Sequence, residues 1–163
     1  MTLRIRALES GDETAIRSIL NHYVRTGFAA FAQERIGREE CDRLIAASCG
    51  YPFFVLEKDE KDVVGFARLR PYHRFQTFRR TAVWTCFILP EHTGSGHGKA
   101  LLDRILQHAE PMGIQNILAE ISSENANSLQ FHSKLGFREC GRLKGIGRKF
   151  GRDFDIVLMQ KVL

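Results

Sequence analysis

Apolar residues recur at two spacings along the chain. In seven stretches they alternate with polar residues or form short apolar runs, which predicts β-strands. These stretches are residues 3–7, 53–58, 63–69, 81–89, 114–121, 137–141 and 154–162. In four other stretches they recur every three or four residues, which predicts helices. One helix follows the caps Ser10 and Asp12 and has an apolar stripe up to Val24, and the others cover residues 38–48, 99–110 and 125–134.

The order of these elements, β-α-α-β-β-β-α-β-α-β-β, predicts a mixed α/β fold built as a single domain over residues 1–163. A helix joins strands 81–89 and 114–121, and a helical crossover predicts that these two strands run parallel. Shorter links join the outer strands, which are expected to be antiparallel. Gly136 is expected to end the last helix in a left-handed conformation.

Composition narrows the class of protein. The formal net charge is +5, and the four cysteines show no zinc-site spacing, so we expect no metal and small apolar thiols in a reducing compartment. The N-terminus shows no signal-peptide core and no apolar run approaches the ~20 residues that span a bilayer, so we expect a cytoplasmic protein with no membrane partner. The basic residues are scattered and match no nucleic-acid-binding motif, so no nucleic-acid partner is expected.

The segment after strand 81–89 is rich in glycine. It reads Thr93-Gly94-Ser95-Gly96-His97-Gly98. Alternate glycines let a ligand approach the backbone N–H groups, and the positive end of the following helix suits a pyrophosphate. The spacing is neither that of a Walker loop nor that of a Rossmann fingerprint. Taken alone, a glycine-rich turn that binds nothing explains the segment equally well.

A second motif follows at residues 125–137, which read Asn-Ala-Asn-Ser-Leu-Gln-Phe-His-Ser-Lys-Leu-Gly-Phe. This segment resembles the N-x-x-A-x-x-L-Y-E-K-L-G-F signature of the GNAT family of N-acetyltransferases. Residues 93–98 resemble that family's Q/R-x-x-G-x-G/A loop, with Thr93 in place of Gln or Arg. Residues 19–24 and the tail from Gly147 to Gln160 are similar to the phosphinothricin acetyltransferase branch of the family.

The resemblance implies a twisted, mostly antiparallel sheet with helices on both faces. A central parallel pair of strands would splay around the site of acetyl-CoA, the expected co-substrate. The acceptor would be the amine of a small molecule, and the chain would form a homodimer.

The resemblance also assigns acetyl-CoA contacts to three segments. A bulged strand end would pair with the pantetheine arm and supply an oxyanion donor, the glycine-rich loop would hold the phosphates, and the second motif would contact pantetheine. The residues so assigned are Cys86, Phe87, Ile88, Thr93, Gly94, Ser95, Gly96, His97, Gly98, Lys99, Asn125 and Ser128. A plain buried strand and, for Asn125, a helix N-cap are the alternative interpretations.

Direct attack of an amine on the thioester needs a proton for the CoA sulfur and an amine without its extra proton. His132 stands where many relatives have the Tyr that protonates the sulfur, although a packed helix residue is the alternative. The branch has a Glu on its central strand where this chain has Val83. The base would then be His73, Glu34 or a water chain, or an amine of low pKa would need none.

The identity of the acceptor stays open. Arginines at positions 68, 70, 74, 79 and 80 suit a carboxylate or phosphinate, as in phosphinothricin or methionine sulfoximine, or form only a solvated strand end. A polyamine would need clustered carboxylates. A peptide N-terminus as acceptor and a CoA-binding sensor without catalysis are the alternatives, and Val83 favours the sensor.

Overall fold

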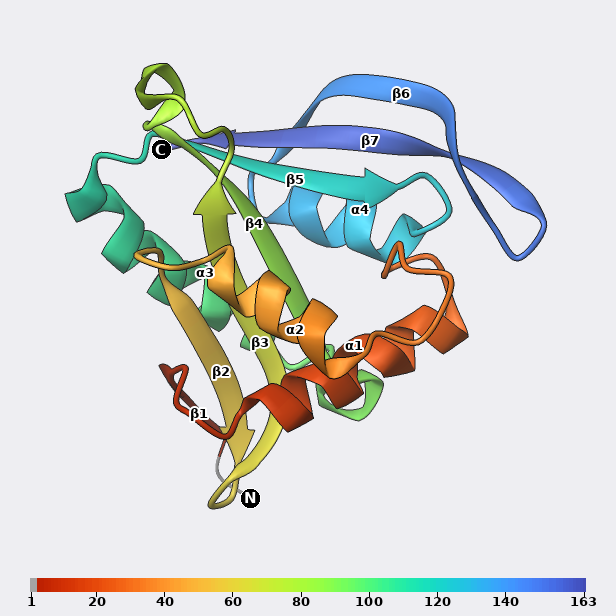
Figure 1. Ribbon diagram of the computed structural model, residues 1–163. Coiled ribbons are helices and arrows are strands. Elements are labelled where there is room, and N and C mark those ends of the chain that lie inside the picture. The colour runs from red at the N-terminus through yellow and green to blue at the C-terminus, as the bar shows by residue number, and fades with distance from the viewer. Residues whose placement is uncertain (1–2) are drawn as a thin grey trace.

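The computed structural model describes residues 3–163 and contains a seven-stranded sheet (Figure 1). The strands lie in the order β1-β2-β3-β4-β5-β7-β6. Their bounds are β1 Leu3–Ala7, β2 Phe53–Lys58, β3 Asp62–Pro71, β4 Thr81–Ile88, β5 Asn116–Ser122, β6 Arg138–Lys149 and β7 Arg152–Val162. Strands and helices follow one another along the chain as the hydrophobic pattern predicts.

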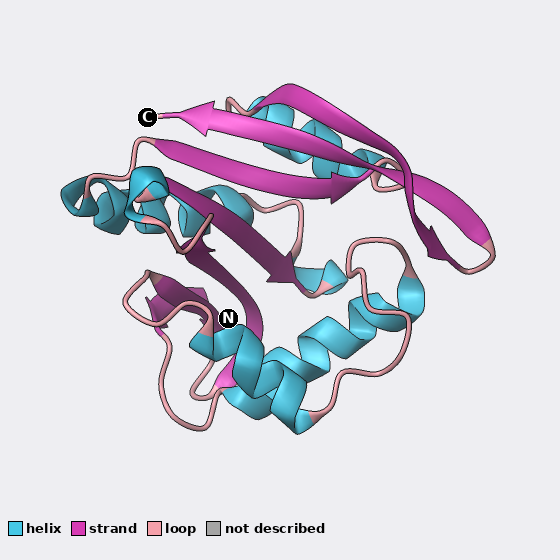
Figure 2. Ribbon diagram, turned by 45° about the horizontal axis from the view of Figure 1, so that its top comes forward, coloured by secondary structure: helices cyan, strands magenta, loops and turns pink. Residues whose placement is uncertain are grey.

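Helices flank both faces of this sheet (Figure 2). Their bounds are α1 Glu13–Thr26, α2 Arg38–Ala46, α3 His97–Ala109 and α4 Ala126–Lys134, with 3₁₀ turns η1 Gln76–Phe78, η2 Pro90–His92 and η3 Glu110–Met112. On β2, Val55 belongs to the apolar cluster beneath α1 and α2, whereas its neighbour Phe54 belongs to the cluster beneath α3. Successive side chains of a strand point to opposite faces, so the sheet separates two cores.

The predicted apolar stripes of the helices are buried. They comprise Ile16, Ile19, Leu20 and Val24 on α1, and Leu101, Leu102, Ile105 and Ala109 on α3. Each fully buried Leu or Ile contributes roughly 1.5–3 kcal/mol, so these stripes hold the two helices to the sheet. Within residues 3–163, no helix combines the length and the apolar character needed to cross a membrane.

β4 and β5 form the expected parallel pair, but they pair over a short distance. Thr81 pairs with Asn116, and the pairing ends with Val83 and Leu118. Beyond this point β4 stays paired with β3 up to Ile88, while β5 stays paired with β7. The two strands diverge from this short contact, and the sheet divides into two halves (Figures 1 and 2).

Two expectations about the strands are wrong in detail. The bulge expected at residues 86–88 is absent, because β4 keeps a continuous register with β3; free backbone groups on β4 arise from the divergence of β5 instead. β6 extends beyond the expected strand 137–141 as far as Lys149. The second half of β6 is exposed and rich in glycine, so it shows no apolar pattern, and its pairing with β7 keeps it in the sheet.

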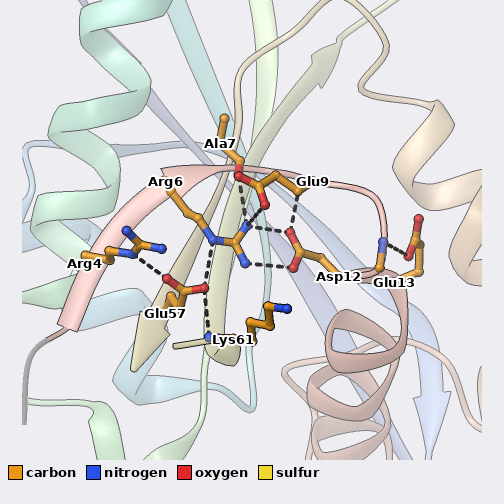
Figure 3. A network of polar contacts seen from close by, with 9 residues as sticks. Arg4, Arg6, Ala7, Glu9, Asp12, Glu13, Glu57 and Lys61 are labelled. Atoms are coloured by element: carbon orange, nitrogen blue, oxygen red, sulfur yellow. Dashed lines mark hydrogen bonds and ion pairs between the residues drawn. The ribbon is translucent and has the colours of Figure 1, made fainter. Parts of the chain in front are cut away.

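A network of charges fastens β1 to β2 and to the start of α1 (Figure 3). Glu57 on β2 is 2% exposed and accepts hydrogen bonds from the guanidinium groups of Arg4 and Arg6. Asp12 precedes α1 as expected, yet its carboxylate accepts from Arg6, at 2.8 and 2.9 Å, and from the N–H of Glu9 rather than from the helix. The bond from Arg4 lowers the pKa of Glu57, and the bond from Arg6 lowers the pKa of Asp12.

Replacing Glu57 with Gln should lower the free energy of unfolding at pH 7 by about 2–3 kcal/mol, because two guanidinium groups lose a buried carboxylate. A carboxyl group with a lowered pKa stabilises the fold above its unfolded-state pKa of about 4.3, and that stability is lost as the pH falls. The difference between Glu57→Gln and wild type should therefore shrink between about pH 5 and pH 3. Denaturant unfolding at several pH values measures it; an equal difference at pH 7 and pH 3 would contradict this role of the charge.

Candidate functional site

The glycine-rich segment forms a loop between η2 and the N-terminus of α3. Gly94 and Gly96 have φ angles of +80° and +84°, and no atom lies within 4 Å of a Cβ built on either, so the backbone conformation itself requires glycine. Among residues 3–163, none accepts a hydrogen bond from the N–H groups of residues 94–99. Free amides at the positive end of a helix are suited to bind a pyrophosphate.

α4 lies close to this loop. A Cβ on Gly98 would lie 2.7 Å from Cζ of Phe131, so glycine at this position lets α4 pack against the first turn of α3. Asn125 caps α4, because its Oδ1 accepts a hydrogen bond from the N–H of Ser128 at 3.2 Å. The alternative interpretation of Asn125 as an N-cap is confirmed, and the contact of Asn125 and Ser128 with pantetheine stays a prediction.

One edge of β4 faces the space into which β5 does not follow. The N–H of Leu89 donates to the carbonyl of Val64 on the β3 side. The N–H and C=O of one residue point to the same side of a strand, and this side alternates along the strand, so the N–H and C=O of Cys86 and Ile88 face away from β3. The carbonyl of Ile88 accepts a hydrogen bond from the hydroxyl of Tyr23 on α1. The N–H groups of Cys86 and Ile88 remain directed into this space.

The intervening side chains lie on opposite faces of β4. The ring of Phe87 lies 5.3 Å from that of Tyr23, on the α1 side, and the N–H and C=O of Phe87 face β3. Cys86 packs against the cluster beneath α3, and burial raises the pKa of its thiol to about 12. Cys86 is therefore a protonated thiol at neutral pH.

His132 lies on α4, and its buried side chain faces Trp84 of β4. The residue is 7% exposed, and the indole N–H of Trp84 donates to Nε2 of its ring at 2.9 Å. Nδ1 lies 2.7 Å from the carbonyl oxygen of Ser128 and 3.2 Å from Oγ of the same residue. Burial lowers the pKa of His132 below its usual range. Both ring nitrogens are therefore engaged within the protein.

A cavity of about 440 Å³ opens near the ends of β4 and β5. The end of α1 and the loop after it, the β5–α4 connection and the β6–β7 hairpin line it, with residues Tyr23, Thr26, Gly27, Phe28, Ala29, Glu124, Asn125, Phe150 and Arg152. Tyr23 bonds to Ile88 of β4 and Asn125 begins α4, so the cavity adjoins the free edge of β4. Its volume suits a small molecule.

Two opposite charges meet in the wall of this cavity. Nη2 of Arg152 donates to Oε2 of Glu124 at 2.5 Å, and the guanidinium lies 5.7 Å from the ring centre of Phe28. The side chains of Arg152 and Glu124 are 63% and 27% exposed, respectively. An ion pair this accessible contributes little to stability. A charged ligand can therefore replace either partner of the pair at little cost in free energy.

Lys149 ties two walls of the cavity together. Its side chain is buried, and Nζ donates to the carbonyls of Gly27 and Ala30, both at 2.7 Å. Nζ also lies 5.0 Å from the ring centre of Phe150, and burial lowers the pKa of the ammonium group. The loop after α1 is thereby fixed to the β6–β7 hairpin.

Neither of the two side chains expected as bases lines this cavity. His73 lies in the hairpin between β3 and β4, where Nδ1 accepts from the N–H of Phe75 at 3.3 Å. That hairpin precedes Thr81, whereas the cavity adjoins Ile88, so the length of β4, roughly 23 Å, separates the two. Glu34 is exposed in the α1–α2 loop. The roles of His73 and Glu34 as bases stay predictions.

The five arginines do not form one patch. Arg68 is buried and donates to the carbonyl of Leu44 on α2 at 3.0 Å, and Arg70 pairs with Glu120 at 3.5 Å. The arginines at positions 74, 79 and 80 are exposed around the β3–β4 hairpin. Arg68 is therefore not part of an exposed substrate loop, and the binding of a carboxylate or phosphinate by the other four arginines stays a prediction. Within residues 3–163, His, Cys, Asp and Glu side chains form no group of three that could hold a metal ion.

The sequence patterns single out neither Glu124 nor Arg152. Glu124 stands in the connection after the carboxyl end of β5, where ligands of open α/β sheets bind, and directly precedes the N-cap of α4, whereas Arg152 is the first residue of β7. This position indicates that Glu124 is a candidate ligand-binding residue. Arg152 reaches the cavity because β6 is longer than the hydrophobic pattern predicts. The pattern therefore does not indicate that Arg152 lies near a ligand.

The comparison with known proteins agrees with this arrangement. A model described as acetyltransferase (GNAT) domain matches residues 5–158. The chain is 34% identical over 164 residues to phosphinothricin N-acetyltransferase of Alcaligenes faecalis, covering 98% of this chain and 82% of that protein. It is 32% identical over 163 residues to the L-amino acid N-acyltransferase MnaT of Escherichia coli, covering 97% and 92%.

A solved structure shows the same fold. The structure of yncA from Salmonella typhimurium with its cofactor acetyl-CoA matches with a TM-score of 0.89 at 32% identity, covering 100% of this chain and 95% of that one. The family model, the two relatives and the shared fold agree. The chain therefore belongs to the GNAT family and is an N-acetyltransferase.

Proposed function

We propose that this enzyme transfers the acetyl group of acetyl-CoA to the primary amine of a small, amino-acid-like substrate of the phosphinothricin or methionine sulfoximine type. The cavity beside the free edge of β4 carries the proposal, because Glu124 and Arg152 face the same space there. An amino acid offers an amine to the carboxylate and a carboxylate to the guanidinium. The names of the A. faecalis and E. coli relatives support a substrate of this class.

Acetyl-CoA is held mainly by backbone groups in this proposal. The free N–H groups of residues 94–99 receive the pyrophosphate. The pantetheine arm, which contains amide groups, pairs with Cys86 and Ile88 along the free edge of β4. One of these two N–H groups then stabilises the charge that develops on the thioester oxygen. The acetyl-CoA bound in the yncA structure supports this co-substrate.

The amine nitrogen attacks the thioester carbon, so that a C–N bond forms and the C–S bond breaks. The nitrogen loses one proton and the sulfur gains one, which balances the reaction of a neutral amine. Glu124 takes the extra proton of an ammonium substrate, a role that Val83, buried on β4, cannot fill. Cys86 does not act as a nucleophile because burial keeps its thiol protonated.

Other acceptors differ from an amino acid in ways that an assay separates. A peptide N-terminus has no carboxylate next to its amine, and a polyamine has none at all. A protein that binds CoA without transferring the acetyl group to any amine would act as a sensor.

Replacing Gly96 with Ala should weaken CoA binding about tenfold, since a left-handed conformation costs a residue with a Cβ roughly 1–2 kcal/mol and the loop would rearrange. Isothermal titration of CoA measures the effect. Gly113→Ala is the matched control, because Gly113 has a φ of +78° and equally open surroundings but ends η3, away from the loop. Equal weakening in both variants would refute phosphate binding by this loop.

Replacing Arg152 with Met should raise KM for an amino-acid acceptor about tenfold and leave KM for its decarboxylated analogue unchanged, because only the former has a carboxylate.

Replacing Glu124 with Gln should lower kcat about 10²-fold with an ammonium-forming acceptor, because an amide cannot take the proton of the ammonium group. Release of CoA thiol, with mass spectrometry of the product, measures both across phosphinothricin, methionine sulfoximine, amino acids, polyamines and a peptide.

Arg148→Met is the control for Arg152→Met, since Arg148 lies on the same hairpin and pairs with Asp153 at 2.8 Å outside the cavity lining. It should leave both KM values unchanged. If Arg152→Met affects the two acceptors equally, the assignment of the carboxylate to Arg152 is wrong.

We also propose that the enzyme is a homodimer formed through the β3–β4 hairpin. Tyr72, Phe75 and Phe78 are 46%, 54% and 40% exposed on this hairpin, and exposed aromatic clusters mark interfaces. Light scattering after size exclusion should give twice the mass of one chain, and the double variant Phe75→Ser with Phe78→Ser should give a monomer. A monomeric wild type would contradict this assembly.

A further inference from the structure

A hydrogen bond between Trp84 and His132 joins β4 to α4 at the point where β5 leaves β4. Trp84 follows Val83, the last residue of β4 that pairs with β5. The indole N–H donates to Nε2 of His132 at 2.9 Å, and the two residues are 3% and 7% exposed. Because an indole N–H can only donate, Nε2 of His132 must be the acceptor.

This bond fixes the position of the imidazole proton. With Nε2 as acceptor, the proton of neutral His132 lies on Nδ1 and is donated to the carbonyl of Ser128 at 2.7 Å. The aromatic side chains of Trp84, Phe131 and Phe137, which carry no charge, lie beside the ring. Burial lowers the pKa of His132, so the ring is neutral at pH 7. Its one proton is held by the backbone of α4.

The same bond sets the position of α4. Asn125 and Ser128, which the family resemblance assigns to pantetheine, lie in the first turn of α4, and Phe131 rests against Gly98 of α3. The bond to Trp84 holds this helix next to the free edge of β4. The spacing between α4 and β4 therefore depends on a buried donor and acceptor that satisfy each other.

We propose that His132 is a positioning residue for acetyl-CoA and not the acid that protonates the CoA sulfur. As a neutral acceptor it holds α4 against β4, so that the space for pantetheine exists before the co-substrate binds. The proton that the sulfur gains is the one that the amine nitrogen loses, and it does not pass through His132. This inference rests on the proposed function, because it requires acetyl-CoA to lie between α4 and β4.

Four variants separate positioning from acid catalysis. His132→Phe removes both hydrogen bonds, and His132→Gln keeps an acceptor for Trp84 but cannot titrate. Trp84→Phe removes the donor and leaves the imidazole, and the double variant Trp84→Phe with His132→Phe closes a cycle. Isothermal titration gives the Kd of CoA, and CoA-thiol release gives kcat as a function of pH.

A positioning role predicts about tenfold weaker CoA binding in Trp84→Phe and in His132→Phe, because each leaves a buried polar group without its partner. The double variant should bind CoA no more weakly than either single variant, since both remove one interaction. His132→Gln should stay within about threefold of wild type in Kd and kcat and keep the wild-type pH profile, because no essential proton resides on the ring.

Glu57→Gln is the control for lost stability, because it weakens the fold at the β1 edge of the sheet, and it should leave the Kd of CoA unchanged. A loss of about 10²-fold in kcat for His132→Gln at wild-type CoA affinity, with kcat retained in Trp84→Phe, would overturn the proposal in favour of the acid role. If wild type binds no CoA, the proposed function fails first, and the inference fails with it.

Discussion

The site depends on how far β4 and β5 stay paired. Strands paired along their full length satisfy each other's peptide groups and leave none for a ligand. Here β5 follows β7 and β4 follows β3, so the two strands separate after Val83. The glycine-rich loop, α4 and the cavity lie around this separation. A division of the sheet, rather than an inserted residue, therefore creates the free edge of β4.

The sites proposed for the two ligands differ in the kind of surface that they offer. Backbone amides of the loop and of β4 face the proposed position of acetyl-CoA, so few side chains there are constrained. The cavity proposed for the acceptor is lined by side chains from three parts of the chain, and these are held together by Lys149 and by Phe28 and Phe31, whose rings pack against Phe154.

The sequence predicted the features that depend on local pattern. The element order, the buried stripes of α1 and α3, the N-cap Asn125 and the left-handed Gly136, with a φ of +86°, are all confirmed. It missed features that depend on residues far apart in the chain. Trp84 and His132 are 48 residues apart and Arg152 and Glu124 are 28 apart, so no spacing reveals either pair. The expected bulge is absent because β4 keeps a continuous register with β3, and the residues of β4 alone do not determine that register.

Hydrogen exchange of the backbone amides, followed by NMR with and without saturating CoA, tests the central claim most directly. The N–H groups of Cys86, Ile88 and residues 94–99 have no acceptor among residues 3–163 of the protein itself. If CoA lies along the free edge of β4 with its phosphates at the loop, exchange at these amides should slow on binding, while amides of β1 and β2 should not change. Binding of CoA without protection of Cys86, Ile88 and the loop would contradict the account.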